Sequence, residues 1–398
     1  MKFNKVVIFK GSAQFNMLRK LSDDLAIAFK RQGSDVRIID LTDIDKAVKE
    51  IHDIKYWKPD LAIGFTPWGL INVPKGNDKI PIHIFWNCKF VSWLVDSAIS
   101  HFPEFEPFLS LPDFYLACPD SMNDQWVKKY YPSAKSFVLL HAISINEILP
   151  FESLRNKRDI KISFLSSIGE NQDKFLPQWK KEMPPIFYDI CLKVVEHCFK
   201  NPHENLWEKI EKAIKENNVS LEPDRYKYAV AFIYVRAERF LRYKKKLQGA
   251  LALKGIGLKV WGDENWKDYK KDGIDYVGLV DATESNKIFQ RSNLILHIQP
   301  PQIIEGLHER LLIGMANGAV AIAEGANAIK KLNNEAEQII DINLSDSKEL
   351  RTKINSVCRD NSYLEKLARN AHEEVLKNHT LAIRIKELKR ELTRIAMN

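Results

Sequence analysis

The feature that most constrains the fold of this chain is a repeated alternation of short apolar runs with segments of helical length. In the first 150 residues such runs occur at 6–9, 36–40, 60–65, 80–86, 114–119 and 136–142. A second series lies at 160–169, 258–262, 275–279, 294–298, 319–323 and 338–342. Short continuous apolar runs separated by helices are typical of parallel strands buried on both faces. The sequence therefore predicts an α/β protein with two doubly wound, Rossmann-like sheets that face a cleft.

The break between the two series divides the chain. Residues 149–159 (LPFESLRNKRD) are polar and charged, which is typical of a linker. We expect a first domain over residues 1–150 and a second over 159–375. Residues from about 175 to 253 have helical periodicity, with one further apolar run, AFIYV, inside them. They are interpreted as helices inserted after the first strand of the second domain.

A separate C-terminal helix is predicted over residues 376–398. Its apolar residues recur at spacings of four and three, which makes one face apolar: Leu381, Ile385, Leu388, Leu392 and Ile395. This face would pack on the body of the protein, or would lie on a membrane surface or a second copy of the chain.

Cysteine usage and hydropathy indicate the compartment. The five cysteines are widely spread and form no C-x-x-C pair, so they suggest neither a disulfide framework nor a zinc site. No apolar run approaches the roughly 20 residues that a membrane-spanning helix needs. The sequence therefore predicts a cytoplasmic protein.

The net charge of +8 fits three kinds of partner: nucleic acid, an anionic membrane surface, or a small anionic ligand. Much of the basic excess lies in residues 236–246 (RAERFLRYKKK) and in the final helix. Those helices would suit peripheral contact with an anionic membrane or with a polyanionic acceptor.

The segment most suggestive of chemistry is GLHERLLIGMANGAVAIAEG at residues 306–325. We expect a helix here with charge at its start, in Glu305, His308, Glu309 and Arg310, and a strand after Gly318. A charged helix start combines backbone N–H donors with side chains that can hold hydroxyls or a diphosphate. Alternatively, the two glutamates only complement the helix dipole and pair with Arg310.

This segment resembles the second domain of GT-B glycosyltransferases. In that domain a Glu begins the donor-sugar helix and a small-residue turn ends it, and Glu305 and GMANG (314–318) match these features. The E-x7-E pattern of family 4 would need a second Glu at position 313, where this chain has Ile313. The contact to the ribose that the family makes there is therefore not expected.

A closer resemblance is to the group 1 glycosyltransferases related to spore-maturation proteins. Their H/N-E-R motif is matched by His308, Glu309 and Arg310. Further segments resemble theirs in the same order: 92–98, 139–144, 158–167, 260–266 (VWGDENW) and 379–384 (HTLAIR). The resemblance implies a glycosyltransferase, specifically a hexosyltransferase, that uses a nucleoside-diphosphate sugar such as a UDP-sugar.

The same resemblance implies roles for individual residues. The second domain would bind the donor through Glu305, Gly306, His308, Glu309, Arg310 and Gly262, with Lys174 and Arg239 as helpers at the leaving diphosphate. Enzymes of this kind need no bound metal and no cofactor. The sequence does hold D-I-D at residues 43–45, the D-x-D form of metal-dependent glycosyltransferases, and we interpret it as a chance match.

The first domain would bind the acceptor. An inverting transfer needs a base, and Asp96, after an apolar run, is the first choice, with His141 and His101 in reserve. A retaining transfer would need no such base, and the leaving phosphate and Glu305 would take its place. The acceptor is open: a glycan, a protein, a lipid or a nucleic acid.

Two alternatives keep the fold but change the function. The chain could glycosylate DNA or another nucleic acid, with its basic inserted helices following the phosphates. It could also be a non-catalytic protein that binds nucleotide sugars or polyanions, which Ile313 in place of a Glu permits. In every version Trp261 and Trp266 would either pack in the core or stack on a nucleobase.

Overall fold

The computed structural model describes residues 2–154, 158–324, 327–344 and 346–397. Two compact units divide the chain: unit 1 contains residues 1–147, 281–283 and 378–398, and unit 2 contains 148–280 and 284–377. Of the predicted linker, residues 155–157 lie outside the described residues, as do residue 325 of the 306–325 segment and the last residue of the predicted final helix.

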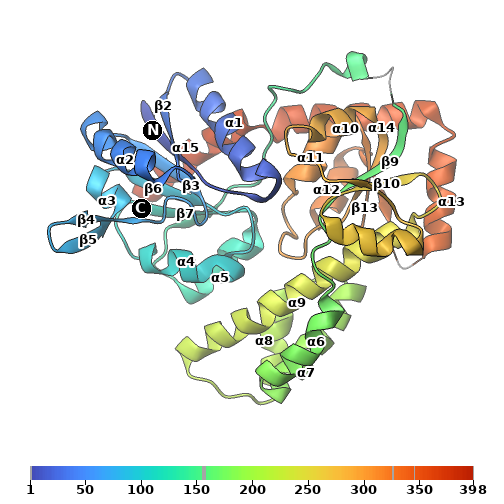
Figure 1. Cartoon of the computed structure of the whole chain (residues 1–398), viewed down its shortest axis with the longest axis horizontal. Coiled ribbons are helices and arrows are strands. Elements are labelled where there is room, and N and C mark those ends of the chain that lie inside the picture. The colour runs from blue at the N-terminus through green and yellow to red at the C-terminus, as the bar shows by residue number, and fades with distance from the viewer. Residues whose placement is uncertain (1, 155–157, 325–326, 345, 398) are drawn as a thin grey trace. The chain divides into compact units, whose positions relative to one another are not determined.

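Unit 1 is built on a parallel sheet of six strands in the order β2-β1-β3-β6-β7-β8 (Figure 1). The strands are β1 (Lys5–Lys10), β2 (Asp35–Asp40), β3 (Leu61–Phe65), β6 (Lys89–Trp93), β7 (Phe114–Cys118) and β8 (Ser136–Val138). Helices α1 (Met17–Arg31), α2 (Ile44–Trp57), α3 (Ile82–Trp86), α4 (Ala98–Phe105) and α5 (Ser121–Tyr130) connect them. Strands β3 and β7 are buried at every position, as continuous apolar runs predict.

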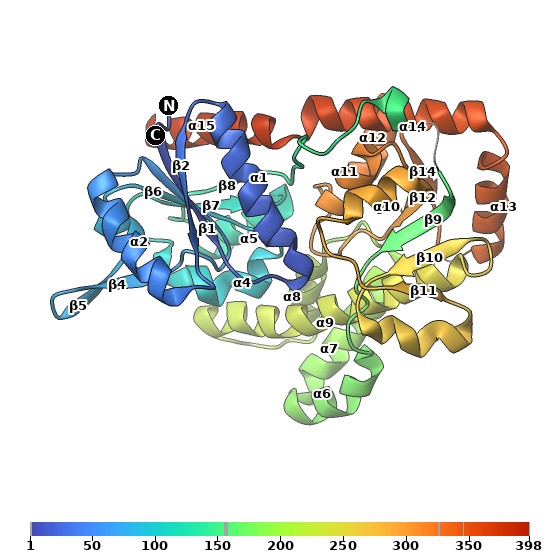
Figure 2. The same ribbon diagram turned by 45° about the horizontal axis from the view of Figure 1, so that its top comes forward.

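One predicted strand of unit 1 is wrong. Residues 80–86 were expected to extend as one strand, but they form the end of a hairpin, β4 (Asn72–Lys75) with β5 (Asp78–Pro81), and the short helix α3. Pro81 has no N–H to donate to a ladder, and its φ of −57° suits the N-cap position of α3. The fourth strand of the sheet is β6, which follows directly and contains the buried Ser92. Figure 2 shows the hairpin projecting from unit 1.

The C-terminal helix, α15 (Leu381–Met397), belongs to unit 1 and packs on it, the first of the roles expected for the apolar face. Leu381, Ile385, Leu388 and Leu392 join the apolar core of that unit. A hydrogen bond also joins this helix to α1: Gln32 Nε2, just after α1, donates to the Ala382 carbonyl at 3.1 Å. The apolar face of the helix is therefore covered by its own chain.

Unit 2 is built on a second parallel sheet, in the order β11-β10-β9-β12-β13-β14. Its strands are β9 (Ile160–Leu165), β10 (Leu258–Trp261), β11 (Asp275–Gly278), β12 (Ser292–His297), β13 (Val320–Glu324) and β14 (Ile339–Ile342). Its helices other than the inserted ones are α10 (Ser285–Arg291), α11 (Glu309–Ala316), α12 (Asn327–Glu335), α13 (Ser347–Val357) and α14 (Asn361–Asn378). Six parallel strands in each unit confirm the predicted fold class.

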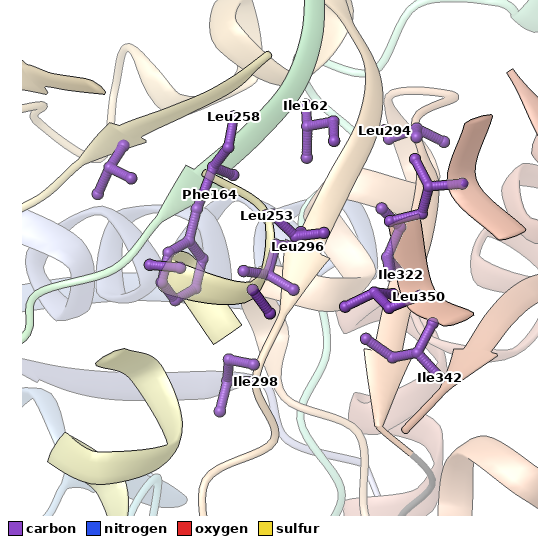
Figure 3. Packing of buried hydrophobic residues seen from close by; sticks show 14 of the residues in the cluster. Ile162, Phe164, Leu253, Leu258, Leu294, Leu296, Ile298, Ile322, Ile342 and Leu350 are labelled. Carbon is purple, nitrogen blue, oxygen red and sulfur yellow. The ribbon is translucent and has the colours of Figure 1, made fainter. Parts of the chain in front are cut away.

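The core of unit 2 joins every strand of this sheet to the helices around it. Figure 3 shows Phe164, Leu296, Ile322 and Ile342 from four strands, with Leu350 from α13, in one apolar cluster. Gly314 lets α11 lie directly on the sheet, because a Cβ there would come within 2.1 Å of Ile295 Cδ1. Strand β12 and helix α11 are therefore held in a fixed relation.

The predicted insertion consists of helices joined by short loops. It contains α6 (Leu176–Glu182), α7 (Pro185–Lys200), α8 (Leu206–Glu216) and α9 (Pro223–Ala252), which extend from the sheet of unit 2 in Figure 1. The AFIYV run lies inside α9, whose buried face it forms with Tyr243 and Gly249. The C-terminal third of α9 returns to the sheet, since a Cβ on Gly249 would meet Ile298 Cδ1 at 2.7 Å.

Two further expectations concern the compartment. Within the described residues, no helix is long and apolar enough to cross a membrane. All five cysteines are free thiols, and four of them are buried: Cys88, Cys118, Cys191 and Cys198. Burial raises the pKa of Cys191 to about 12, so this thiol is unreactive at neutral pH.

Candidate active site

The sheet order of unit 2 creates a crevice at one defined place. The connections from β9 run to β10 on one side, whereas β12 lies on the other side of β9, so the chain reverses direction between β9 and β12. Ligands of open α/β sheets bind outside the carboxyl ends of the strands at such a point. In this unit the residues there are Ser166 and Ser167, after β9, and His297, at the end of β12.

Three cations from two helices meet at this crevice: Arg242 and Lys246 of α9 and Arg310 of α11, together called the cation cluster below. Lys246 Nζ donates to the Ser167 carbonyl at 2.6 Å, and an Nη1 of Arg310 donates to Ser166 Oγ at 3.4 Å. Arg242 is ion-paired with Glu238 one turn earlier in α9. Spacing of four residues brings Arg242 and Lys246 onto one face of the helix.

The electrostatics of the cation cluster favour an anion. Burial, followed by the charges of Arg242 and Arg310, lowers the pKa of Lys246 well below its ordinary value. Burial also lowers the pKa of Arg310; the charge of Glu309 raises it in part, and Arg242 lowers it further. Among the residues that the structure describes, neither Lys246 nor Arg310 has a carboxylate within ion-pair distance. Two partly desolvated cations that form no ion pair suit a phosphate or a similar group.

The loops beside the cation cluster are held by close backbone contacts. Gly262 follows β10, and a Cβ there would come within 2.2 Å of the Ser166 carbonyl oxygen. Asp263 Oδ2 accepts from the Gly169 N–H at 2.8 Å, which ties the end of β10 to the loop after β9. Gly262 thus allows an approach that no other residue permits.

Helix α11 begins one turn later than predicted. His308 is its N-cap residue, and its Nδ1 accepts from the Arg310 N–H at 3.2 Å and lies 3.3 Å from Glu309 Oε2. Glu305 is not part of the helix start: it is exposed in the preceding loop, where its carboxylate accepts from Asn327 Nδ2 at 2.6 Å. The helix cannot start earlier, because the loop from residue 299 to 306 is held in a different conformation.

Gln299 holds that loop. Its Nε2 donates to the carbonyls of Ile303 and Gly306, at 2.7 and 2.9 Å, and its Oε1 lies 2.7 Å from His297 Nε2. Burial lowers the pKa of His297 to about 4, so its ring is neutral near pH 7 and its Nε2–H donates to Gln299. Nothing in the sequence singled out Gln299, whose role depends on carbonyls that only the folded loop brings together.

The two helper cations predicted from the sequence lie elsewhere. Lys174 and Arg239 are both exposed, and neither side chain forms an ion pair with another described residue. Their predicted role at the diphosphate stays a prediction. The cations that the fold brings next to Arg310 are Arg242 and Lys246, three and seven residues beyond Arg239. Their four-residue spacing in the basic run 236–246 was the available signal.

The two tryptophans of the 260–266 segment are structural. Trp266 is fully buried, and its Nε1 donates to the Ser166 carbonyl at 2.6 Å. Trp261 ends β10 with 9% of its surface exposed. Trp266 therefore packs in the core and fixes the backbone beneath the cation cluster.

The predicted acceptor-side residues all lie in unit 1. Asp96 is half-buried in the loop after β6, at the carboxyl edge of the sheet. His141 is buried after β8, and His101 lies in α4, with its Nδ1 3.6 Å from Glu104.

Two other motifs have structural roles. Asp43 of the D-I-D tripeptide is the N-cap of α2 and accepts from the Lys46 N–H at 3.1 Å. In the HTLAIR segment Arg384 is 2% exposed and donates to the carbonyls of Leu140 and His141, at 3.1 and 3.3 Å. Arg384 therefore fastens α15 to the end of β8.

Comparison with known proteins finds a family likeness in the second half of the chain. Residues 238–390, which include the whole cation cluster, match the family described as glycosyl transferase-like. No curated protein matches the chain. The family match supports the predicted resemblance to group 1 glycosyltransferases over these residues.

Solved structures share the architecture over nearly the whole chain. An α-glucosyltransferase in complex with UDP and DNA superimposes with a TM-score of 0.57 at 10% identity, covering 98% of this chain and 99% of the other. HepE from Anabaena, in complex with UDP and glucose, gives 0.53 at 12% identity, with coverages of 98% and 99%. Sucrose-phosphate synthase from Thermosynechococcus elongatus gives 0.53 at 10% identity, with coverages of 98% and 100%.

Proposed function

We propose that this glycosyltransferase moves a hexose from a nucleoside-diphosphate sugar, bound in unit 2, to an acceptor hydroxyl bound in unit 1. The observation that carries the proposal is the cation cluster at the crevice of the second sheet, where neither Arg310 nor Lys246 has a carboxylate within ion-pair distance among the described residues. A diphosphate supplies the negative charge that such a cluster attracts. UDP is the expected nucleotide, because similar folds have been solved with UDP bound.

The cation cluster fits the chemistry of the leaving group. In the transfer, the bond between the anomeric carbon and the β-phosphate oxygen breaks, and the diphosphate leaves with the electron pair. Negative charge grows on that oxygen, and positive groups already held in place stabilise it. Arg310 offers a planar set of N–H donors and Lys246 a compact charge. Three protein cations would supply the charge for which other transferases use a metal ion, so we propose a metal-independent reaction.

Asp96 is the proposed base of an inverting reaction. It would accept the proton of the acceptor hydroxyl as the new glycosidic bond forms. If the reaction inverts, Asp96→Asn should lower kcat by about a hundredfold or more, because a positioned base contributes on the order of 10²–10⁴. Proton NMR of the first product formed reports the anomeric configuration. A retained configuration, with Asp96→Asn fully active, would remove Asp96 from the reaction.

The donor half of the proposal is tested by titration calorimetry with UDP and UDP-glucose. Wild type should bind both, and Arg310→Met should bind UDP about tenfold to a hundredfold more weakly, the loss expected for one or two charge-assisted hydrogen bonds. Arg390→Met, which removes a cation from the exposed side of α15, is the matched control. The fold of each variant is checked by circular dichroism.

Turnover is measured by release of UDP from UDP-glucose without an acceptor, since hydrolysis separates an enzyme from a binding protein. Slow UDP release that Arg310→Met abolishes would support the proposal. If wild type binds neither UDP nor other nucleoside diphosphates, the donor assignment is wrong. Binding without any UDP release, with or without acceptor, would instead support a non-catalytic nucleotide-sugar protein.

A further inference from the structure

The sheet of unit 1 has a crevice of its own. In the order β2-β1-β3 the chain leaves β1 toward β2 on one side, while β3 and the later strands lie on the other. The reversal therefore falls between β1 and β3, and a ligand of this unit is expected outside their carboxyl ends. The loops there begin with Gly11, after β1, and Thr66, after β3.

A tryptophan side chain lies across this crevice. A Cβ on Gly11 would come within 2.3 Å of Trp68 Nε1 and 2.5 Å of Trp68 Cε2, so the indole rests directly on the Gly11 backbone. Gly64 makes the turn possible, since a Cβ there would meet the Trp68 carbonyl oxygen at 1.8 Å. Gly69 has a φ of +83° and contacts the Phe9 ring. Three glycines thus let the loop after β3 fold back and place one indole at the mouth of the crevice.

The loop that holds the indole is fixed by hydrogen bonds. The backbone N–H of Trp68 donates to the Phe65 carbonyl at 2.7 Å, which closes the turn, and Thr66 Oγ1 lies 2.6 Å from Ser92 Oγ of the neighbouring strand. Trp68 packs against the core of unit 1, yet it remains half-buried, with the exposed Pro67 beside it. A rigid aromatic face at a crevice is a common element of small-ligand sites.

The charge around Trp68 differs from that of unit 2. The segments that directly follow the six strands of unit 1 contain no Lys or Arg: 11–16, 41–43, 66–70, 94–97, 119–120 and 139–142. Lys10, the last residue of β1, is paired with Asp23 at 2.6 Å, and Arg19 is paired with Asp40 at 2.6 Å. The side chains that these segments do offer include Ser12, Thr42 and Asp96.

We infer that Trp68 is the platform for the acceptor and that the acceptor is a carbohydrate, with the apolar face of a pyranose ring packed on the indole. This inference rests on the proposed function, in which unit 1 binds the acceptor. Asp96 follows β6, the strand that pairs with β3, so both residues lie at the same edge of the sheet. Carboxylates and hydroxyls bind sugar hydroxyls, while an aromatic ring covers the C–H face of the sugar.

A nucleic-acid acceptor fits this edge less well. A nucleobase can also stack on an indole, but its phosphates need cations along the path of the strand. Lys10, at the end of β1, and Arg19 are paired with Asp23 and Asp40. Arg19 also holds the pKa of the Asp40 carboxyl far below its ordinary value, which shows how firmly that pair is engaged.

The test uses saturation-transfer NMR on the full-length protein in the presence of UDP. The probes are methyl β-glucopyranoside, methyl α-glucopyranoside, maltose and a single-stranded DNA decamer. The variants are Trp68→Leu, which removes the aromatic face, and Trp68→Phe, which keeps it. Trp57→Leu is the matched control: Trp57 is also half-buried in unit 1, but its Nε1 bonds Asp35 at the amino end of β2, the opposite edge of the sheet.

At least one pyranoside should receive saturation at its ring protons in wild type, in Trp68→Phe and in Trp57→Leu. Trp68→Leu should weaken binding at least tenfold, with UDP affinity measured in the same samples within about twofold of wild type. Three results would overturn the inference: no pyranoside binds wild type, Trp68→Leu and Trp57→Leu behave alike, or only the DNA binds in a Trp68-dependent way. Loss of UDP binding by wild type would instead contradict the proposed function.

Discussion

At the scale of single residues, Lys246 and Arg310 are two cations whose charged forms are disfavoured by burial. Two cations in a partly desolvated crevice repel each other, and burial opposes their charged forms more than the nearby carboxylates favour them. Such an arrangement is unfavourable for the empty fold and favourable for a dianionic ligand. Function and stability should therefore respond in opposite directions when one of these charges is removed.

Lys246→Met tests whether ligand affinity and stability change in opposite directions. The variant should bind UDP about tenfold or more weakly, because a charge-assisted hydrogen bond is lost, while its unfolding temperature should rise above that of wild type. Titration calorimetry and thermal unfolding by circular dichroism measure the two effects. Arg239→Met, seven residues earlier on α9 and exposed, is the control and should change both quantities little. Equal losses in both variants would mean that the whole basic face of α9, and not the cation cluster, holds the donor.

The lowered pKa of Lys246 also predicts a dependence on pH. In the free protein Lys246 loses its proton at a lower pH than an ordinary lysine. A bound diphosphate favours the charged form and raises that pKa again, so binding takes up a proton in the interval between the two values. Affinity for UDP-glucose, whose phosphates do not titrate in this range, should therefore fall as pH rises through the lowered pKa.

Calorimetry in buffers of different ionisation enthalpy counts the protons taken up. Lys246→Met should bind weakly but with no such uptake in the same interval. An uptake that persists in this variant would assign the proton to another group.

At the scale of elements, particular segments show which strands and helices could be predicted from the sequence and which could not. Fully buried strands such as β3 and β7 were predictable, because burial on both faces leaves an uninterrupted apolar run. Residues 80–86 were not, since periodicity does not separate a short helix from a strand over five residues. The short AFIYV run contains β-branched residues, which favour strands, but it is helical because it lies inside the 30-residue helix α9.

Arg384 links two elements far apart in the sequence, α15 and the end of β8. Its guanidinium also donates to Glu387 at 2.9 Å and lies 3.0 Å from His379 Nδ1. Arg384→Met should leave two buried carbonyls without a donor and destabilise the docking of α15 by about 2–3 kcal/mol.

Hydrogen exchange measures that effect locally, which matters because a chain of two units does not unfold in one step. Residues 381–397 should exchange faster in Arg384→Met, and the cation cluster of unit 2 should keep its UDP affinity. Arg390→Met, at an exposed position of the same helix, should exchange like wild type. Unchanged protection of α15 in Arg384→Met would show that its apolar face alone holds the helix.

At the scale of the whole molecule, the two units have the same sheet architecture but opposite electrostatics at their crevices. In unit 2 the cations come from helices α9 and α11, not from the segments that follow the strands. Arg310 was predictable from its motif, but Lys246 and Arg242 lie in a basic run that also contains the exposed Arg239. Net charge could not separate the buried cations of that run from the solvated ones.

This asymmetry predicts that salt separates the two binding events. Raising NaCl from about 50 mM to 500 mM shortens the Debye length from roughly 14 Å to about 4 Å, so the attraction of the cation cluster for a diphosphate weakens. The Kd for UDP-glucose should rise severalfold over this range, whereas a neutral pyranoside should bind wild type equally at both ends. Calorimetry for the nucleotide and saturation-transfer NMR for the pyranoside measure the two responses. If acceptor binding weakened more steeply with salt than UDP-glucose binding, the acceptor would be held through phosphates. The anionic ligand would then be assigned to unit 1 and not to unit 2.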